Sequence, residues 1–116
     1  MKKIISLLVC VFILTACGSS YETIDSNVAM NLINNNAVVI DVRSLDEYNT
    51  GHIEGSINIP VDSINSISYS KDTTIIVYCA SGMRSANAAD TLTKLGYTSV
   101  YNLDGGLINW GFELVD

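Results

Sequence analysis

The pattern of apolar and polar positions divides most of the chain into short segments that alternate between strand-like and helix-like periodicity. The runs 37–40 and 74–78 are apolar or β-branched almost throughout, which is typical of strands buried on both faces of a sheet. Shorter strands are expected at 21–24, 57–59 and 98–101. Each of these runs is followed by a turn or by helical spacing, as in a chain that builds a sheet from successive crossovers.

The segments between the strands carry capping residues and apolar positions at helical spacing. We expect a helix capped by Asp25 or Ser26, a short helix from Ser44 to Tyr48 with Glu47 in a capping box, a brief helix plus loop at 61–67, a helix after Cys79 and a final turn and helix at 104–111. The apolar face of the first helix is Val28, Ala29, Leu32 and Ile33, and that of the helix after Cys79 is Ala86, Ala89, Leu92 and Leu95, with Gly96 as its stop. The alternation predicts an α/β domain with a largely parallel sheet.

The N-terminus has the pattern of an export signal. Lys2 and Lys3 precede an apolar run at 4–14, which is too short to span a bilayer. The run ends in Leu-Thr-Ala-Cys17, which resembles the lipobox of bacterial lipoproteins. That resemblance implies a signal peptide at 1–16 and a lipidated, palmitate-bearing Cys17 that begins a short tether at 17–20. The alternative is an ordinary secretory signal followed by an unrelated cysteine.

Removal of the signal changes the charge balance of the chain. Without Lys2 and Lys3, four basic residues face twelve acidic ones, a net charge of −8. Such an acidic domain has no electrostatic footprint for nucleic acid and no basic patch for anionic lipid. The signal predicts a location outside the cytoplasm, and without a basic patch only the lipid would hold the domain at the bacterial membrane. We expect the domain to be a monomer. The tether at 17–20 reaches about 14 Å at full extension, so the domain would lie close to the bilayer.

Of the three cysteines, only Cys79 is expected to remain as a free thiol. Cys10 leaves with the signal and Cys17 is expected to carry lipid, so Cys79 has no partner for an internal disulfide. It is either buried and inert or kept for chemistry. One cysteine and one histidine make a poor metal site, and we expect no metal or cofactor.

The position of Cys79 favours chemistry. In an open parallel sheet the functional crevice lies beyond the carboxyl ends of the strands, where one strand leads to Asp41 and Arg43 and another leads to Cys79. The small or flexible residues between Cys79 and the following helix allow backbone N–H groups to turn inward. Together with the helix N-terminus and Arg84, these N–H groups would favour a thiolate and bind an anion. The alternative is a core cysteine that happens to precede a surface arginine.

Several ordered motifs resemble those of the rhodanese-like sulfurtransferases over residues 21–116. The stretch CASGMRS at 79–85 is similar to the family's Cys-x-x-Gly-x-Arg loop, and AVVIDVR at 37–43 is similar to its strand with Asp-x-Arg. The segment 47–60 resembles its Gly-His-Ile signature and 105–110 its late Gly-Gly turn. The resemblance implies a rhodanese-like α/β fold, in which a largely parallel sheet is flanked by helices on both faces.

The resemblance also implies a mechanism. The Cys79 thiolate would take sulfane sulfur from a small anionic donor such as thiosulfate, and the persulfide would pass it to an external acceptor such as cyanide, a small thiol or a thiol protein. The residues expected to bind the substrate are Ala80, Ser81, Gly82, Met83, Arg84 and Ser85. Asp41 and Arg43 either support the donor or loop directly or form a salt bridge that fixes the strand end. His52 is expected to be structural rather than an acid or base, and Trp110 to pack in the core.

Two other functions use the same residues. A phosphatase or arsenate reductase with a related loop has its arginine six positions after the cysteine, whereas here the spacing from Cys79 to Arg84 is five. A shorter loop has fewer inward N–H groups, which suits a sulfur atom better than a tetrahedral oxyanion. The second alternative is a non-enzymatic, membrane-tethered module that binds a partner or carries a persulfide.

Overall fold

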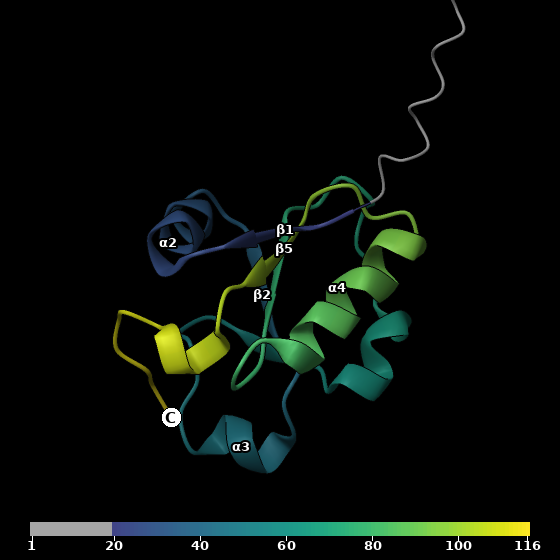
Figure 1. Cartoon of the computed structure of the whole chain (residues 1–116). Coiled ribbons are helices and arrows are strands. Elements are labelled where there is room, and N and C mark those ends of the chain that lie inside the picture. Colours follow the sequence, from purple (N-terminus) through teal and green to yellow (C-terminus); the bar gives the residue numbers. More distant parts are fainter. Residues whose placement is uncertain (1–19) are drawn as a thin grey trace, which may run out of the picture.

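A computed structural model describes residues 20–116 and shows a single twisted sheet between helices (Figure 1). Five parallel strands lie in the order β1-β5-β4-β2-β3. Their bounds are Glu22–Ile24 for β1, Val38–Asp41 for β2, Ile57–Asn58 for β3, Ile75–Tyr78 for β4 and Val100–Leu103 for β5. The predicted α/β fold with a parallel sheet is confirmed.

Helices cover both faces of the sheet (Figure 1). They are α2 at Ser26–Asn34, α3 at Leu45–Asn49, α4 at Met83–Lys94, and the 3-10 helices η2 at Val61–Ser66 and η3 at Gly106–Asn109. The capping box at the start of α3 is present, since the Ser44 hydroxyl accepts the Glu47 N–H and the Glu47 carboxylate accepts the Ser44 N–H. Residues 51–60 follow α3 and lead through β3 to η2.

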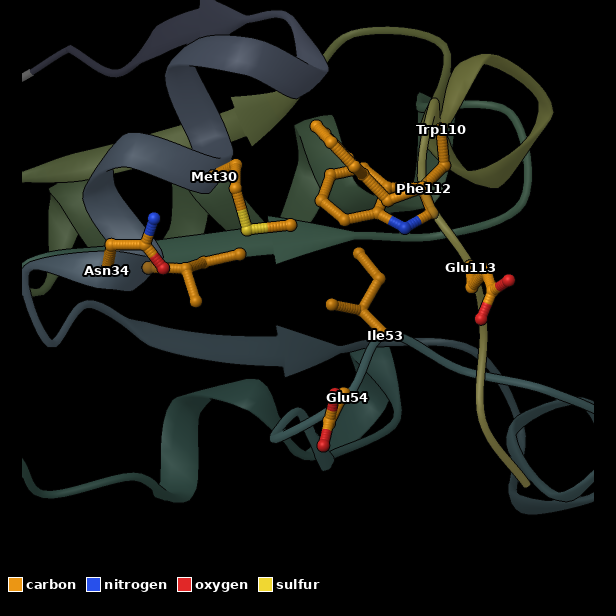
Figure 2. A pocket seen from close by; sticks show the side chains of 8 residues that line it. Met30, Asn34, Ile53, Glu54, Trp110, Phe112 and Glu113 are labelled. Carbon is orange, nitrogen blue, oxygen red and sulfur yellow. The ribbon is translucent and has the colours of Figure 1, made fainter.

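One face of the sheet packs against α2 and the C-terminal segment. Ile76 and Tyr78 of β4 point into this cluster, which Trp110 covers from outside. The Trp110 ring meets Phe112 edge to face at 5.2 Å, so the tryptophan packs against the core as expected. Between α2 and these rings lies a hollow of about 400 Å³ (Figure 2), lined by Met30, Ile33, Asn34, Ile53, Glu54, Trp110, Phe112 and Glu113. None of these lining residues belongs to the Cys79 loop.

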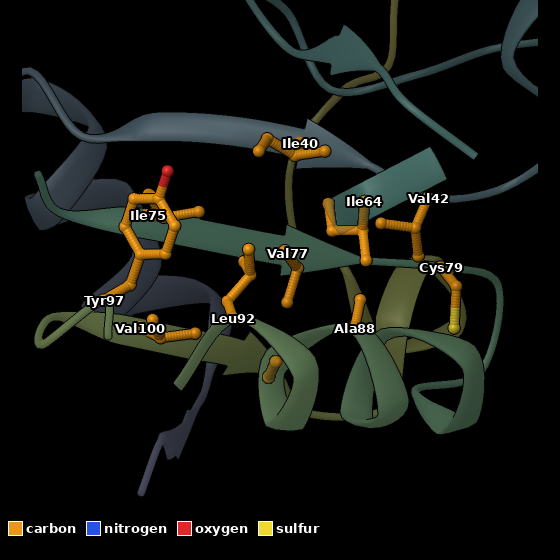
Figure 3. Close-up of a cluster of buried hydrophobic side chains, with 11 residues drawn as sticks. Ile40, Val42, Ile64, Ile75, Val77, Cys79, Ala88, Leu92, Tyr97 and Val100 are labelled. Atoms are coloured by element: carbon orange, nitrogen blue, oxygen red, sulfur yellow. The ribbon is translucent and has the colours of Figure 1, made fainter. Parts of the chain in front are cut away.

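The other face packs against α4 and η2 and reaches the reactive cysteine. Ile75 and Val77 of β4 meet Ala88 and Leu92 of α4 in a fully buried cluster. Cys79 forms the end of this cluster, with its sulfur beside the first turn of α4 (Figure 3). The alternation of β4 side chains between two clusters accounts for its unbroken apolar sequence.

Three details of the sequence prediction were wrong. Val28, expected on the apolar face of the first helix, is 44% exposed, and Ala29 is the only fully buried residue of α2. The last strand lies at 100–103 rather than 98–101, because the Tyr97 N–H still bonds the end of α4 and the Thr98 N–H bonds Lys71. On α4, the buried positions are Ser85, Ala88, Ala89, Leu92 and Thr93, whereas Ala86 is half-buried and Leu95 exposed. The buried stripe is rotated because hydrogen bonds draw Ser85 inward toward Cys79 and Asn102.

The predicted signal peptide at 1–16, the lipidation site Cys17 and nearly all of the tether at 17–20 lie outside the described residues. Within the part of the chain that the structure describes, no helix has the length and apolar character needed to cross a bilayer.

Candidate active site

The Cys79 loop joins the end of β4 to the start of α4 at the carboxyl edge of the sheet. Cys79 is buried, and Gly82 ends the loop with φ +106°, a left-handed conformation that glycine adopts without strain. The η3 turn closes the loop from outside, since Leu107 N–H donates to the Cys79 carbonyl at 3.0 Å and Ile108 N–H donates to the Ala80 carbonyl at 3.1 Å. The loop is therefore held between β4, α4 and η3.

The sulfur of Cys79 takes the place of a helix cap. Gly82, the residue before α4, has no side chain to accept the free N–H groups of the first turn. The Cys79 Sγ instead accepts the Gly82 N–H at 3.1 Å and the Ser85 N–H at 3.4 Å, and the Ser85 hydroxyl lies 3.4 Å away. Burial opposes ionisation of the thiol, but hydrogen bonds from Ser85, Gly82 and Ser81 outweigh it and hold the pKa of Cys79 below its ordinary value.

Ser85 is itself oriented by Asn102, which the sequence patterns did not indicate as a site residue. Asn102 of β5 is buried, and its Oδ1 accepts the Ser85 hydroxyl at 2.6 Å. A polar residue in a buried strand needs a hydrogen-bond partner, and this requirement could have indicated that Asn102 contacts another polar group. The predicted strand ends at residue 101, so Asn102 was not counted as part of a buried strand.

Removing the Ser85 hydroxyl should raise the pKa of Cys79, because the hydroxyl lies 3.4 Å from Sγ and can turn its single proton from Asn102 to the thiolate. For Ser85→Ala we expect the thiolate absorbance in the ultraviolet to appear at higher pH than in the wild type. The rate of any thiolate reaction should fall several-fold at neutral pH and converge with the wild type at alkaline pH. Ser56→Ala, which removes another buried hydroxyl away from the thiol, is the matched control. An unchanged titration of Cys79 in Ser85→Ala would contradict the assignment.

Arg84 does not lie free at the mouth of the loop. Its two terminal nitrogens donate to the two carboxylate oxygens of Glu47 at 2.9 and 3.0 Å. The sequence predicts Glu47 only as a helix cap, and the structure shows that its carboxylate also joins α3 to α4. No local pattern pairs two residues 37 positions apart, so this contact could not be found from the sequence.

Asp41 and Arg43 form a buried ion pair beneath the loop. The Arg43 guanidinium donates to both oxygens of the Asp41 carboxylate, at 2.6 Å for the shortest contact, and to the Gly51 carbonyl at 2.7 Å. Asn58 donates to the backbone carbonyls of both residues. The pair thus joins the end of β2 to the segment 51–58, which is the salt-bridge alternative considered from the sequence.

Comparison with protein-family models matches a model described as "Rhodanese-like domain" to residues 26–113. The chain belongs to the rhodanese-like family. The resemblance stated from the motifs at 37–43, 47–60, 79–85 and 105–110 is confirmed at this level.

Relatives of this rhodanese-like chain include proteins with and without a named activity. The uncharacterized protein YibN of Escherichia coli K12 is 37% identical over an alignment of 117 positions that covers 94% of this chain and 82% of that protein. Thiosulfate sulfurtransferase GlpE of Ectopseudomonas mendocina is 36% identical over 94 residues, covering 79% of this chain and 86% of that enzyme. A rhodanese-related crystal structure from Thermoplasma volcanium superimposes with a TM-score of 0.73 at 32% identity, covering 82% of this chain and 98% of that one.

The histidine of the rhodanese-like Gly-His turn lies in a structural position. The His52 ring stacks on Tyr48 with centroids 3.7 Å apart, and its Nδ1–H donates to the Tyr48 carbonyl at 2.9 Å. Its backbone pairs with Val115. Among residues 20–116, no three His, Cys, Asp or Glu side chains come together in a group that would hold a metal ion.

Gly106 of the rhodanese-like Gly-Gly turn fits against the Cys79 loop with no room for a side chain. A Cβ there would lie 2.3 Å from the Cys79 carbonyl oxygen and 2.7 Å from that of Ala80, at φ +59°. We expect Gly106→Ala to displace the loop and to lower the free energy of unfolding by about 3 kcal/mol or more.

Gly55→Ala is the matched control for Gly106→Ala, since Gly55 has φ +83° but no atom within 4 Å of the point where an alanine Cβ would lie. Its cost should be about 1 kcal/mol, the strain of the backbone alone. Urea denaturation measures both values, and equal costs for the two variants would contradict the tight packing of the turn against the loop.

Proposed function

We propose that this rhodanese-like domain is a sulfurtransferase that carries sulfane sulfur as a persulfide on Cys79. The observation that carries the proposal is the Cys79 sulfur at the start of α4, where two backbone N–H groups and a serine hydroxyl favour its thiolate. A thiolate in such a position is a nucleophile whose charge the surrounding donors already accommodate.

The reaction would take place in two steps. The Cys79 thiolate attacks the outer sulfur of a donor such as thiosulfate, the donor's sulfur–sulfur bond breaks, and sulfite leaves with the bonding electrons. An acceptor nucleophile such as cyanide or a thiolate then attacks the outer sulfur of the persulfide. The bond to Cys79 breaks, and its electrons restore the thiolate, so ping-pong kinetics follow.

The loop from Ala80 to Ser85 would hold the persulfide through backbone groups. The N–H groups of Gly82 and Ser85 already point at Sγ, and the helix N-terminus adds a positive partial charge. The ion pair of Asp41 and Arg43 fixes the end of β2 beside β4, and would act by positioning the loop rather than by touching the donor. The described part of the chain contains no other cysteine, so the acceptor would be external.

The experiment is intact-protein mass spectrometry of the purified protein before and after exposure to thiosulfate. The proposal expects a gain of one sulfur atom, located on Cys79 by peptide mapping and removed by cyanide. A reduced, folded protein that gains no sulfur from thiosulfate or from an organic persulfide would overturn it, and would favour a binding module.

We further propose that the domain is anchored outside the cytoplasm by a lipid on Cys17, with the signal at 1–16 removed. The lipobox-like sequence at 14–17 supports this. Membrane fractionation of cells that express the wild type or Cys17→Ser tests it: the wild type should sediment with membranes and the variant should not. Equal distribution of the two would refute the anchor.

A further inference from the structure

The positive charges of the described residues are all engaged, and those at the crevice are engaged by carboxylates. Residues 20–116 contain four basic side chains. Near the Cys79 loop, Arg84 pairs with Glu47, and the buried Arg43 pairs with Asp41. Lys94 pairs with Asp90, and Lys71 lies 4.2 Å from the Tyr97 ring centroid, both toward the far end of α4. Within this part of the chain, a small anion approaching Cys79 therefore meets no cation without a counter-charge.

Glu47 is held in place from two sides. Its carboxylate accepts the Ser44 N–H in the capping box of α3, and its two oxygens bind the fork of Arg84. The Arg84 hydrogen bond and the Ser44 backbone lower the pKa of Glu47 to about 2, so the carboxylate stays ionised at any physiological pH. Its charge is thus permanently present beside the start of α4, where the Cys79 loop ends.

The segments that border the loop also carry the three most exposed of the large apolar side chains. Met83 and Ile108 are each 77% exposed, and Leu45 is 58% exposed. Met83 precedes Arg84 at the start of α4, Leu45 lies two residues before Glu47 on α3, and the Ile108 N–H bonds the loop carbonyl of Ala80. We call these three residues the apolar rim. An apolar substituent on a donor would lose water contact by lying against these side chains.

We propose that Glu47 determines donor selectivity by neutralising Arg84, so that the crevice takes sulfane sulfur from an organic persulfide in preference to a small dianion such as thiosulfate. The inference rests on the proposed sulfurtransferase function and names its donor class. The Cys79 thiolate attacks the terminal sulfur of R–S–SH, the S–S bond breaks, and R–S⁻ leaves with the electron pair. The terminal sulfur keeps its proton and becomes the outer sulfur on Cys79. The R group meets the apolar rim.

The chain charge acts in the same direction as Glu47. The domain carries −8, so a dianion is repelled on approach as well as beside the Cys79 loop, whereas the protonated form R–S–SH of an organic persulfide, which is the species that reacts here, carries no charge when R is uncharged and is not repelled. Salt screens such repulsion between exposed charges. Donor selectivity should therefore depend on both Glu47 and ionic strength.

Glu47→Gln tests the inference because glutamine also serves in a capping box, so that α3 keeps its cap while the charge is lost. The probes are thiosulfate and freshly generated butyl persulfide, and the readout is the second-order rate constant for gain of one sulfur on Cys79. We expect the wild type to load faster from butyl persulfide. In Glu47→Gln the thiosulfate rate constant should rise about tenfold, and the butyl persulfide value should change less than about twofold. Asp46→Asn, which removes the neighbouring carboxylate of the same helix, is the control and should change neither.

A second measurement uses the unaltered protein. Raising the ionic strength should increase thiosulfate loading and leave butyl persulfide loading unchanged. A thiosulfate rate that falls in Glu47→Gln, or that falls with salt in the wild type, would overturn the inference while leaving the persulfide on Cys79 established. Loading from neither donor would overturn the proposed function itself, and the inference with it.

Discussion

Replacing Cys79 with serine is expected to abolish sulfur transfer and to leave the fold intact. The serine oxygen can still accept the N–H groups of Gly82 and Ser85, so the start of α4 keeps its partners. A serine hydroxyl, however, is almost entirely protonated at neutral pH and cannot form the persulfide. Turnover of thiosulfate with cyanide should fall by at least about three orders of magnitude, as expected when a covalent nucleophile is removed.

The comparison with Cys79→Ala separates chemistry from folding in this experiment. Alanine removes the acceptor as well as the nucleophile, so both variants should lack turnover, but only alanine should leave the first N–H groups of α4 without a partner. Circular dichroism and urea denaturation should therefore show a larger loss of stability for alanine, by about 1 kcal/mol. Turnover above a tenth of wild type in Cys79→Ser would show that another group forms the covalent intermediate.

Replacing Arg43 with alanine is expected to destabilise the domain by about 3 to 5 kcal/mol, because it leaves the fully buried Asp41 carboxylate without its counter-charge. The same change frees the Gly51 carbonyl, which accepts from Arg43. Loss of both contacts loosens the link between β2 and the segment 51–58. Urea denaturation followed by circular dichroism measures the free energy of unfolding.

Two further variants show whether the cost of Arg43→Ala comes from the unpaired buried charge of Asp41. Lys94→Ala breaks an ion pair whose side chains are 76% and 55% exposed, and should cost less than about 0.5 kcal/mol. Adding Asp41→Asn to Arg43→Ala removes the buried charge, and should recover part of the lost stability. If Arg43→Ala cost no more than Lys94→Ala, the ion pair would not be what fixes the end of β2.

The fold and the position of the loop could be predicted because both depend on local sequence. The apolar runs at 37–40 and 74–78 specify buried strands, and the glycine and helical spacing after Cys79 specify a loop that enters a helix. Asp41 and Arg43 are two residues apart, so their side chains leave the strand end on the same side and a salt bridge was a natural alternative.

The remaining features depend on how distant segments approach each other. Glu47 has a complete local explanation as a helix cap, and nothing in its neighbourhood indicates that it also binds Arg84. Asn102 was missed because the end of α4 continues its hydrogen bonding to Tyr97 and delays the strand by two residues. In both cases the missing information is a tertiary contact. The sequence shows that the residue is polar but does not show which residue it contacts.

Because the Cys79 sulfur caps α4, selection for reactivity and selection for stable folding act on the same atom. A substitution that shifts the loop to improve its chemistry also moves the acceptor for the first N–H groups of the helix, and a substitution that tightens the helix start also moves the nucleophile. A substitution in this loop therefore affects both the reactivity of the thiol and the stability of the fold. Descendants of this chain that lose the chemistry would be expected to replace Cys79 by residues that still accept a hydrogen bond, such as serine or aspartate, more readily than by apolar ones.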